Sequence, residues 1–260
     1  MGNDTITPTD IVDEKESCEY PVHALLAERR SPLAFASTPV ESETLANLME
    51  AARWAPSCMN EQPWSFIVAT KANKSDFDRL LGCLVEFNVQ WAQHAPVLLL
   101  SVAKLTFESM GKPNRHAFHD VGQAIANLTF QATVSGLVVH QMGGFDIEKA
   151  RREFSIPKDY EPVAAVAIGY PGNSADLPEK LRKRDASPRK RKPLTNFVFE
   201  GGWGHSADWT RKVQEPRPAG SEKEDHDSRH QQRDCPKQIK IEPRVPQQSQ
   251  TNFFVGFKKQ

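Results

Sequence analysis

The ten residues from Ala55 to Trp64, APSCMNEQPW, carry the side chains best suited to bind a flat polar ligand. A hydroxyl group and two amides lie between two prolines, and an indole ring follows the second proline. These residue types favour neither a helix nor a strand, so the segment is predicted to form a shaped loop. Hydroxyl and amide groups can hydrogen-bond to the edge of a planar heterocycle while the indole stacks on its face.

Two groups of basic residues are suited to bind an anion. Arg29 and Arg30 precede Ser31, and the run PRKRKPL spans residues 188–194. Guanidinium groups offer forked donors to oxyanions. The first pair could instead complement a helix dipole. The second run could be a solvated segment or a nucleic-acid patch, but it lacks interleaved aromatic residues, and the chain has a formal net charge of zero.

Other kinds of chemistry find little support in the sequence. His119 and Asp120 form a tempting pair, yet no G-x-S-x-G motif supplies a nucleophile, and Asp120 is expected to serve at a helix start or an interface. The chain has four cysteines without a C-x-x-C pair or a metal-ligand spacing, so neither a metal site nor a disulfide framework is predicted. No nucleotide-binding G-x-G-x-x-G or P-loop motif is present.

Helices and strands are expected to alternate around these motifs. The apolar spacing predicts a first helix that ends at Ser31 and Pro32, and later helices at residues 41–54, 76–87, 118–135 and 146–154. Strands are predicted at residues 65–70, 97–102, 137–141 and 163–169. Gly143 and Gly144 fall in the turn between the third strand and the last helix. This order indicates an α+β fold with helices packed around a central sheet.

The two ends of the chain differ from its middle. Residues 1–19 and 205–260 are polar and poor in apolar residues, and they are predicted to be disordered, which leaves residues 20–204 as the folded domain. The first residues do not resemble a secretory signal, and the longest apolar run, residues 96–103, is too short to cross a bilayer. A cytoplasmic protein without a membrane or nucleic-acid partner is therefore expected.

Taken in order, the motifs between Val22 and Gly204 resemble the FMN-binding pattern of the nitroreductase family. The resemblance implies a mostly antiparallel sheet and a homodimer with FMN at the subunit interface. It also implies cofactor contacts from four segments, with Cys58 standing where relatives often have serine, and with Arg191 as the preferred phosphate ligand. The implied cofactor-binding residues are Arg29, Arg30 and Ser31, then Pro56, Ser57, Cys58, Asn60 and Gln62, then Met142, Gly143 and Gly144, and finally Arg189 and Arg191.

By the same resemblance, hydride would pass from NAD(P)H through FMN to an electron-poor acceptor such as a nitroaromatic or a quinone. No side chain is assigned as catalytic, because the cofactor carries the chemistry. Trp91, Phe107, Met110 and Phe118 are candidate pocket walls, with core packing as the alternative for each. Two other functions stay open: a specialised flavin enzyme of the same fold, acting in flavin destruction, dehalogenation or azoline oxidation, and a non-enzymatic FMN-binding redox sensor.

Overall fold

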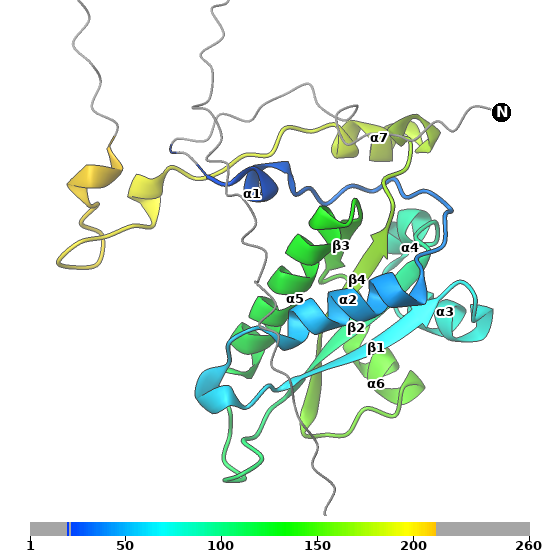
Figure 1. The fold of residues 1–260 in the computed structure, drawn as a ribbon, viewed down its shortest axis with the longest axis horizontal. Helices are drawn as coiled ribbons and strands as arrows, with labels where there is room; N and C mark the ends of the chain where they lie inside the picture. Colours follow the sequence, from blue (N-terminus) through cyan, green and yellow to red (C-terminus); the bar gives the residue numbers. More distant parts are fainter. Residues whose placement is uncertain (1–19, 21, 212–260) are drawn as a thin grey trace, which may run out of the picture. The chain divides into compact units, whose positions relative to one another are not determined.

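The computed structural model describes residue 20 and residues 22–211. Of the segments predicted to be disordered, residues 1–19 and 205–260, all but residues 205–211 lie outside the described residues. Its centre is an antiparallel sheet with the strand order β1-β2-β4-β3 (Figure 1). The strands are β1 (Trp64–Thr70), β2 (Val97–Lys104), β3 (Val138–Met142) and β4 (Tyr160–Gly169). The predicted fold class, an α+β fold with a central antiparallel sheet, is confirmed.

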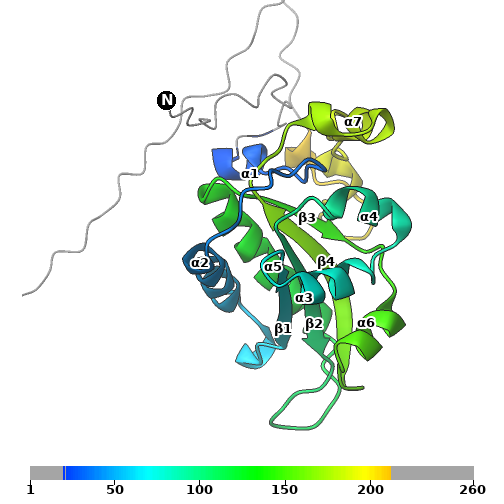
Figure 2. The ribbon, with the colours of Figure 1, turned by 90° about the vertical axis from the view of Figure 1, so that its right-hand side faces the viewer.

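Helices cover both faces of this sheet (Figures 1 and 2). One face carries α2 (Ser42–Arg53) and α5 (Ala117–Val134), and the other carries α3 (Lys74–Leu81), α4 (Glu86–Ala92) and α6 (Ile147–Glu153). Two further helices, α1 (Ala24–Glu28) and α7 (Glu179–Asp185), flank these layers. Short 3-10 turns lie at Cys58–Asn60, Ser174–Asp176, Leu194–Asn196 and Asp208–Thr210.

The side chains of β2 separate the two halves of the core. Leu98 and Leu100 pack with the cluster that includes α3, α4 and α6, whereas Val97 and Leu99 pack with α2 and α5. All four are buried, as expected for successive side chains of a central strand that point to opposite faces. This explains why β2 is a nearly continuous apolar run in the sequence.

The helix expected over residues 76–87 is divided in the structure. Helix α3 ends at Leu81, Leu84 forms an isolated β-bridge with Phe145, and the Val85 backbone N–H donates to the Gly144 carbonyl at 3.1 Å. Helix α4 then starts at Glu86 and buries Trp91 completely, with its ring stacked on Phe35. Trp91 is therefore a core residue and not a pocket wall.

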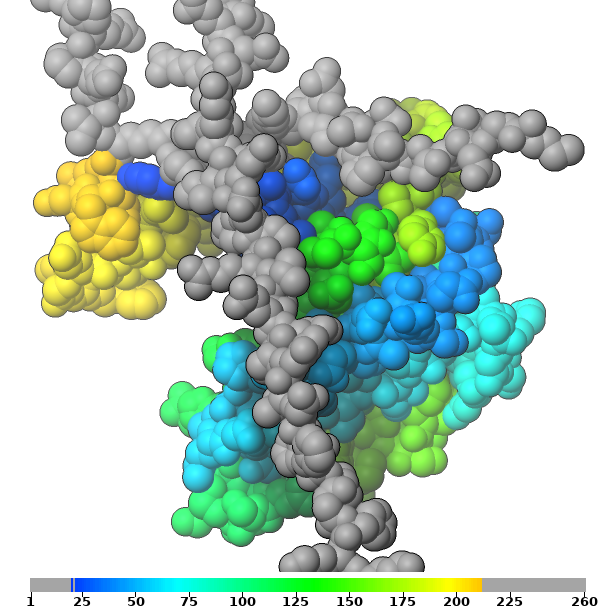
Figure 3. Space-filling view, viewed as in Figure 1, coloured from blue at the N-terminus to red at the C-terminus, as the bar shows by residue number. Residues whose placement is uncertain are grey.

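The described residues continue past Gly204, the predicted end of the domain, to Arg211. Phe199 and Ser206 form a β-bridge, and the Tyr20 hydroxyl donates to the Trp209 carbonyl at 3.1 Å. The segment at residues 199–211, coloured yellow in Figure 3, exposes large aromatic side chains, of which Trp203 is 91% exposed. Within the described part of the chain, no helix is both long and apolar enough to cross a membrane.

Candidate functional site

The loop between α2 and β1, which contains five of the predicted cofactor-binding residues, has an unusual backbone. Met59, Asn60 and Gln62 have φ angles of 54°, 57° and 52°, in the left-handed region that side chains other than glycine seldom adopt. Such a conformation costs energy and persists only when the surroundings fix it, and it is often found at ligand-binding sites. The predicted loop at residues 55–64 is therefore a shaped structure.

Hydrogen bonds hold this loop to itself and to α5. Asp120, which is 2% exposed, accepts the Cys58 backbone N–H at 3.0 Å through Oδ2. The Ser57 hydroxyl accepts the Gln62 backbone N–H at 3.0 Å. Gln123 Nε2 donates to the Pro56 carbonyl at 3.4 Å. Asp120 thus anchors the loop from the first turn of α5, a role that the sequence did not reveal.

The first and last basic motifs come together. Residues Arg29, Arg30 and Ser31 follow α1, and Arg29 Nη1 donates to the Ser31 hydroxyl at 3.2 Å. The Arg189 guanidinium donates to the backbone carbonyls of Ala27 and Arg29. Arg191, in contrast, is exposed, and its Nη1 donates to the Lys190 carbonyl at 3.2 Å. The Arg189 guanidinium would thus have to contact a ligand while it also holds the backbone at Ala27 and Arg29.

The Gly143–Gly144 pair follows β3, and its two residues have different surroundings. Gly143 is exposed, and a Cβ added there would meet nothing within 4 Å. A Cβ on Gly144 would lie 2.8 Å from Asn88 Nδ2 and 3.0 Å from Val85 Cγ2. Met142 is 3% exposed and belongs to the core, so a ligand could meet only its backbone. Gly143 is the residue of this group that leaves room for a ligand.

The strand order separates two of the predicted motifs. The loop at residues 56–62 leads into β1, whereas Gly143 and Gly144 follow β3, and these strands form opposite edges of the sheet. In Figure 1, β1 and β3 are the outer strands of the sheet, with β2 and β4 between them. One copy of the chain therefore joins residues 29–31 to residues 189–191 but does not bring the 56–62 loop to the glycine turn.

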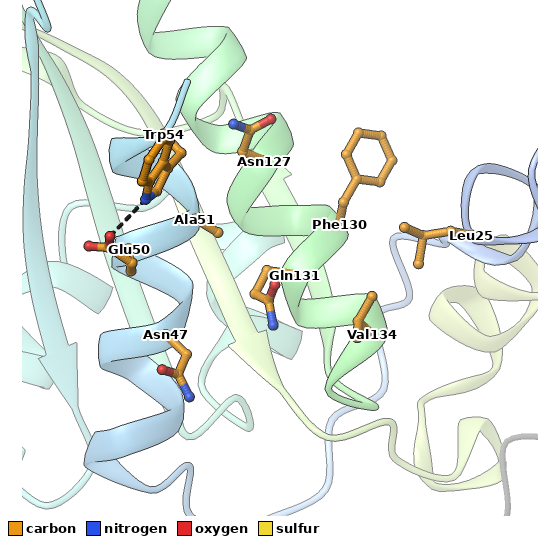
Figure 4. A pocket seen from close by; sticks show the side chains of 9 residues that line it. All are labelled: Leu25, Asn47, Glu50, Ala51, Trp54, Asn127, Phe130, Gln131 and Val134. Carbon is orange, nitrogen blue, oxygen red and sulfur yellow. Dashed lines mark hydrogen bonds between the residues drawn. The ribbon is translucent and has the colours of Figure 1, made fainter. Parts of the chain in front are cut away.

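A hollow of about 530 Å³ lies between α1, α2 and α5 (Figure 4). Trp54 Nε1 donates to Glu50 Oε1 at 2.8 Å at its wall, and Arg53 pairs with the same carboxylate. These hydrogen bonds, first from Arg53 and then from Trp54, lower the pKa of Glu50 to about 2. The hollow contains none of the predicted cofactor-binding residues; it is lined by Leu25, Asn47, Glu50, Ala51, Trp54, Asn127, Phe130, Gln131 and Val134.

One histidine next to the first motif is partly buried. His140 of β3 lies with Nδ1 3.0 Å from the Pro32 carbonyl, and its ring centroid is 4.5 Å from that of Trp91. Burial lowers the pKa of His140, although the hydrogen bond to Pro32 acts in the opposite direction. Among the described residues, no group of three or more His, Cys, Asp or Glu side chains is placed to hold a metal ion.

Comparison with known proteins relates the sequence and fold of this chain to a family of oxidoreductases. The model of the nitroreductase family matches residues 26–170. A solved structure described as an oxidoreductase containing FMN is 34% identical, with a TM-score of 0.70 over 75% of this chain and 100% of that chain. An uncharacterised 15.4 kDa protein of Mycolicibacterium smegmatis is 37% identical over 138 residues, which are 52% of this chain and 91% of that protein.

Other relatives carry functional names. A Streptomyces coelicolor protein provisionally named as an NADH dehydrogenase/NAD(P)H nitroreductase is 30% identical over 167 residues, which cover 57% of this chain and 82% of that protein. At lower identity the chain also resembles iodotyrosine deiodinase 1 of Sus scrofa and 5,6-dimethylbenzimidazole synthase of Rhodospirillum rubrum, each 26% identical. The relatives therefore differ in the reactions for which they are named.

Proposed function

The chain belongs to the nitroreductase family of flavin oxidoreductases, and from this premise we propose that it uses FMN to pass hydride from NADH or NADPH to an electron-poor acceptor. The acceptor class proposed is a nitroaromatic or a quinone. The observation that carries the proposal is the meeting of two cationic segments, residues 29–31 and 189–191, through the Arg189 guanidinium.

The groups present in this chain fit FMN. Arg30 and Arg191 are exposed cations on the two joined segments, and guanidinium groups bind phosphate well. The Ser31 hydroxyl, also exposed, adds a neutral donor. Gly143 gives a flat ring room to approach the backbone, since no atom lies within 4 Å of the place of its missing Cβ. We propose that these residues hold the phosphate and one edge of the flavin.

The protein's own part in the reaction is to bind and orient. FMN, when bound, supplies the hydride chemistry. The chain would fix the ring between the Gly143 backbone and the amide-bearing 56–62 loop, and its arginines would stabilise negative charge. No side chain is proposed as an acid or a base for the hydride step. Donor and acceptor would use the same pocket in turn, which predicts ping-pong kinetics.

We propose further that the site is completed by a second copy of the chain. The 56–62 loop and the glycine turn lie at opposite edges of the sheet, so two copies are needed to bring one loop to the other's turn. The face formed by α2 and α5 supports such a contact, because Trp54 is 74% exposed and Val134 is 67% exposed beside the hollow. Large exposed apolar groups of this kind mark contact surfaces.

A second candidate is a specialised reaction on the same fold. It is favoured by the relatives named as iodotyrosine deiodinase and 5,6-dimethylbenzimidazole synthase. A non-enzymatic redox sensor is the third reading. For each of them we propose a cytoplasmic location, where the free thiols of Cys58 and Cys83 would remain reduced.

An anaerobic absorbance titration tests these readings. The purified protein, as isolated or reconstituted with FMN, is titrated with NADH and then NADPH, and a panel of nitroaromatics and quinones follows. Bleaching of the flavin bands and their recovery with an acceptor is the expected result, and it names the electron donor. Bound FMN that neither nucleotide reduces would favour the specialised enzyme or the sensor. A protein that binds no FMN would overturn the proposal.

A further inference from the structure

Side chains from distant parts of the sequence hold the backbone around the first basic motif. The Arg189 guanidinium donates to the carbonyls of Ala27 and Arg29. Asp185 of α7 accepts the Leu33 backbone N–H at 2.6 Å. His140 of β3 hydrogen-bonds through Nδ1 to the Pro32 carbonyl at 3.0 Å. The three side chains, which we call the clamp, lie between 108 and 162 residues away in sequence from the groups they hold.

The clamp acts on a segment that has little regular structure of its own. Helix α1 ends at Glu28, and no helix or strand spans residues 29–33. The clamp contacts lie on both sides of Arg30 and Ser31, whose side chains remain exposed between them. The backbone is therefore fixed at Arg29 and at Pro32, while the two side chains between these points stay available for a ligand.

The clamp also joins two sets of positive charge. Arg189 is bonded to the segment that carries Arg30, and two residues later Arg191 is exposed. In the part of the chain that the structure describes, neither Arg30 nor Arg191 takes part in an ion pair. Like charges repel each other when they are held close together. A contact that draws these two cationic segments together therefore creates a place where a bound anion would offset the repulsion between them.

We propose that Asp185, Arg189 and His140 are positioning residues for an anionic ligand group, the phosphate of FMN. They act through the backbone of residues 27–33, which they hold so that Arg30 and Ser31 stand beside Arg191. In this assignment Arg189 works through its bonds to Ala27 and Arg29 and not as a direct phosphate ligand. The inference rests on the proposed function, because it takes FMN as the ligand.

The test compares FMN with riboflavin, which has the same ring without the phosphate. The affinity of the cofactor-free protein for each flavin is measured by quenching of flavin fluorescence. Asp185→Ala removes the acceptor for the Leu33 N–H, and we expect FMN to bind about tenfold more weakly, as for loss of a hydrogen bond to a charged group. Riboflavin affinity should stay within about twofold of the parent, which a general loss of structure would not allow.

Three further variants complete the design. Asp185→Asn keeps a side-chain oxygen that can accept the Leu33 N–H, so it should recover most of the FMN affinity. Glu179→Ala is the matched control, since it removes an exposed carboxylate of the same helix whose ion pair is with Lys183, and it should bind both flavins like the parent. If Asp185→Ala does not fold, Arg189→Lys is tested by the same ratio of FMN affinity to riboflavin affinity. Lysine keeps the positive charge of Arg189, but its single ammonium group lacks the two forked donors that bond both carbonyls.

The outcomes separate this assignment from the function beneath it. A parent protein that binds neither flavin overturns the proposed function and the clamp together. If the parent binds FMN and Asp185→Ala keeps the parental ratio of FMN affinity to riboflavin affinity, the assignment of the clamp is overturned while the proposed function stands. Equal weakening of both flavins also overturns it, because the clamp would then support the fold and not the phosphate site.

Discussion

Replacement of Gly144 by alanine is expected to destabilise the protein, whereas the same change at Gly143 is not. The two residues are neighbours in one turn, and only their surroundings differ. A Cβ on Gly144 would lie 2.8 Å from Asn88 Nδ2 and 3.0 Å from Val85 Cγ2, distances that force at least one of these groups to move. A Cβ on Gly143 would meet no atom within 4 Å.

The size of the effect follows from the contacts of Gly144. Asn88 Nδ2 donates to the Gly144 carbonyl at 2.9 Å, and loss of such a neutral hydrogen bond costs about 0.5–1.5 kcal/mol. Overpacking against Val85 adds about 1–3 kcal/mol. We therefore expect Gly144→Ala to lower the free energy of unfolding by about 1.5–4.5 kcal/mol, which for a domain of this size lowers Tm by about 3–18 °C.

Gly143→Ala should leave the free energy of unfolding within about 1 kcal/mol of the parent, because alanine restricts the unfolded chain and fits the open space. It should nevertheless weaken FMN binding, since its methyl group would occupy the side proposed for the flavin. The assay combines urea unfolding with flavin-fluorescence titration for both variants and the parent. A Gly144→Ala protein as stable as the parent, or a Gly143→Ala protein less stable than Gly144→Ala, would refute the reasoning.

Three further outcomes are expected. Asp120→Ala should lower the free energy of unfolding by about 1.5–3 kcal/mol, because the Cys58 N–H loses its hydrogen bond to a charged acceptor. Asp120→Asn should lose less stability. Equal urea midpoints for both variants and the parent would argue against the role of Asp120 in anchoring the loop. The pKa of His140 is lowered from 6.5, so the unfolded chain takes up the proton first as the pH falls. The contribution of His140 to stability is thus present above pH 6.5 and is lost as the pH falls through the lowered pKa of His140. His140→Asn should therefore flatten the dependence of the unfolding free energy on pH in this range. A slope equal to that of the parent would contradict this prediction. Arg191→Ala should weaken FMN binding by about 1.5–3 kcal/mol, measured by flavin titration, and an unchanged affinity would remove Arg191 from the phosphate site.

Much of the fold was predictable because its apolar patterns are local. The amphipathic spacing of Leu45, Leu48 and Ala52 predicts α2 within a residue of its observed ends, and the apolar runs predict strands β2 and β4. The division between α3 and α4 was not predictable. Leu84 continues the helical spacing, yet it pairs with Phe145, so a tertiary contact overrides the local preference.

The candidate site was predictable only where residue type indicates chemistry. A shaped loop was expected at residues 55–64 because its residues disfavour helices and strands, whereas the left-handed backbone of Met59, Asn60 and Gln62 was not expected. The partner of that loop, Asp120, could not be recognised, because its contact with Cys58 joins residues 62 positions apart. The same limit applies to Arg189. Its sequence position indicates a ligand contact, whereas its bonds to Ala27 and Arg29 show what its guanidinium does within the chain.

The burial of Trp91 gives this protein a built-in optical reporter. Trp91 has no exposure to solvent, whereas Trp54, Trp203 and Trp209 are largely exposed and Trp64 is partly exposed, so the emission of Trp91 should lie at the blue edge of the tryptophan spectrum. Its ring lies 4.5 Å from that of His140, centroid to centroid, and a protonated imidazole quenches indole emission. The intensity at the blue edge is therefore expected to fall when His140 takes up a proton, which can be followed in the intact protein without any added label.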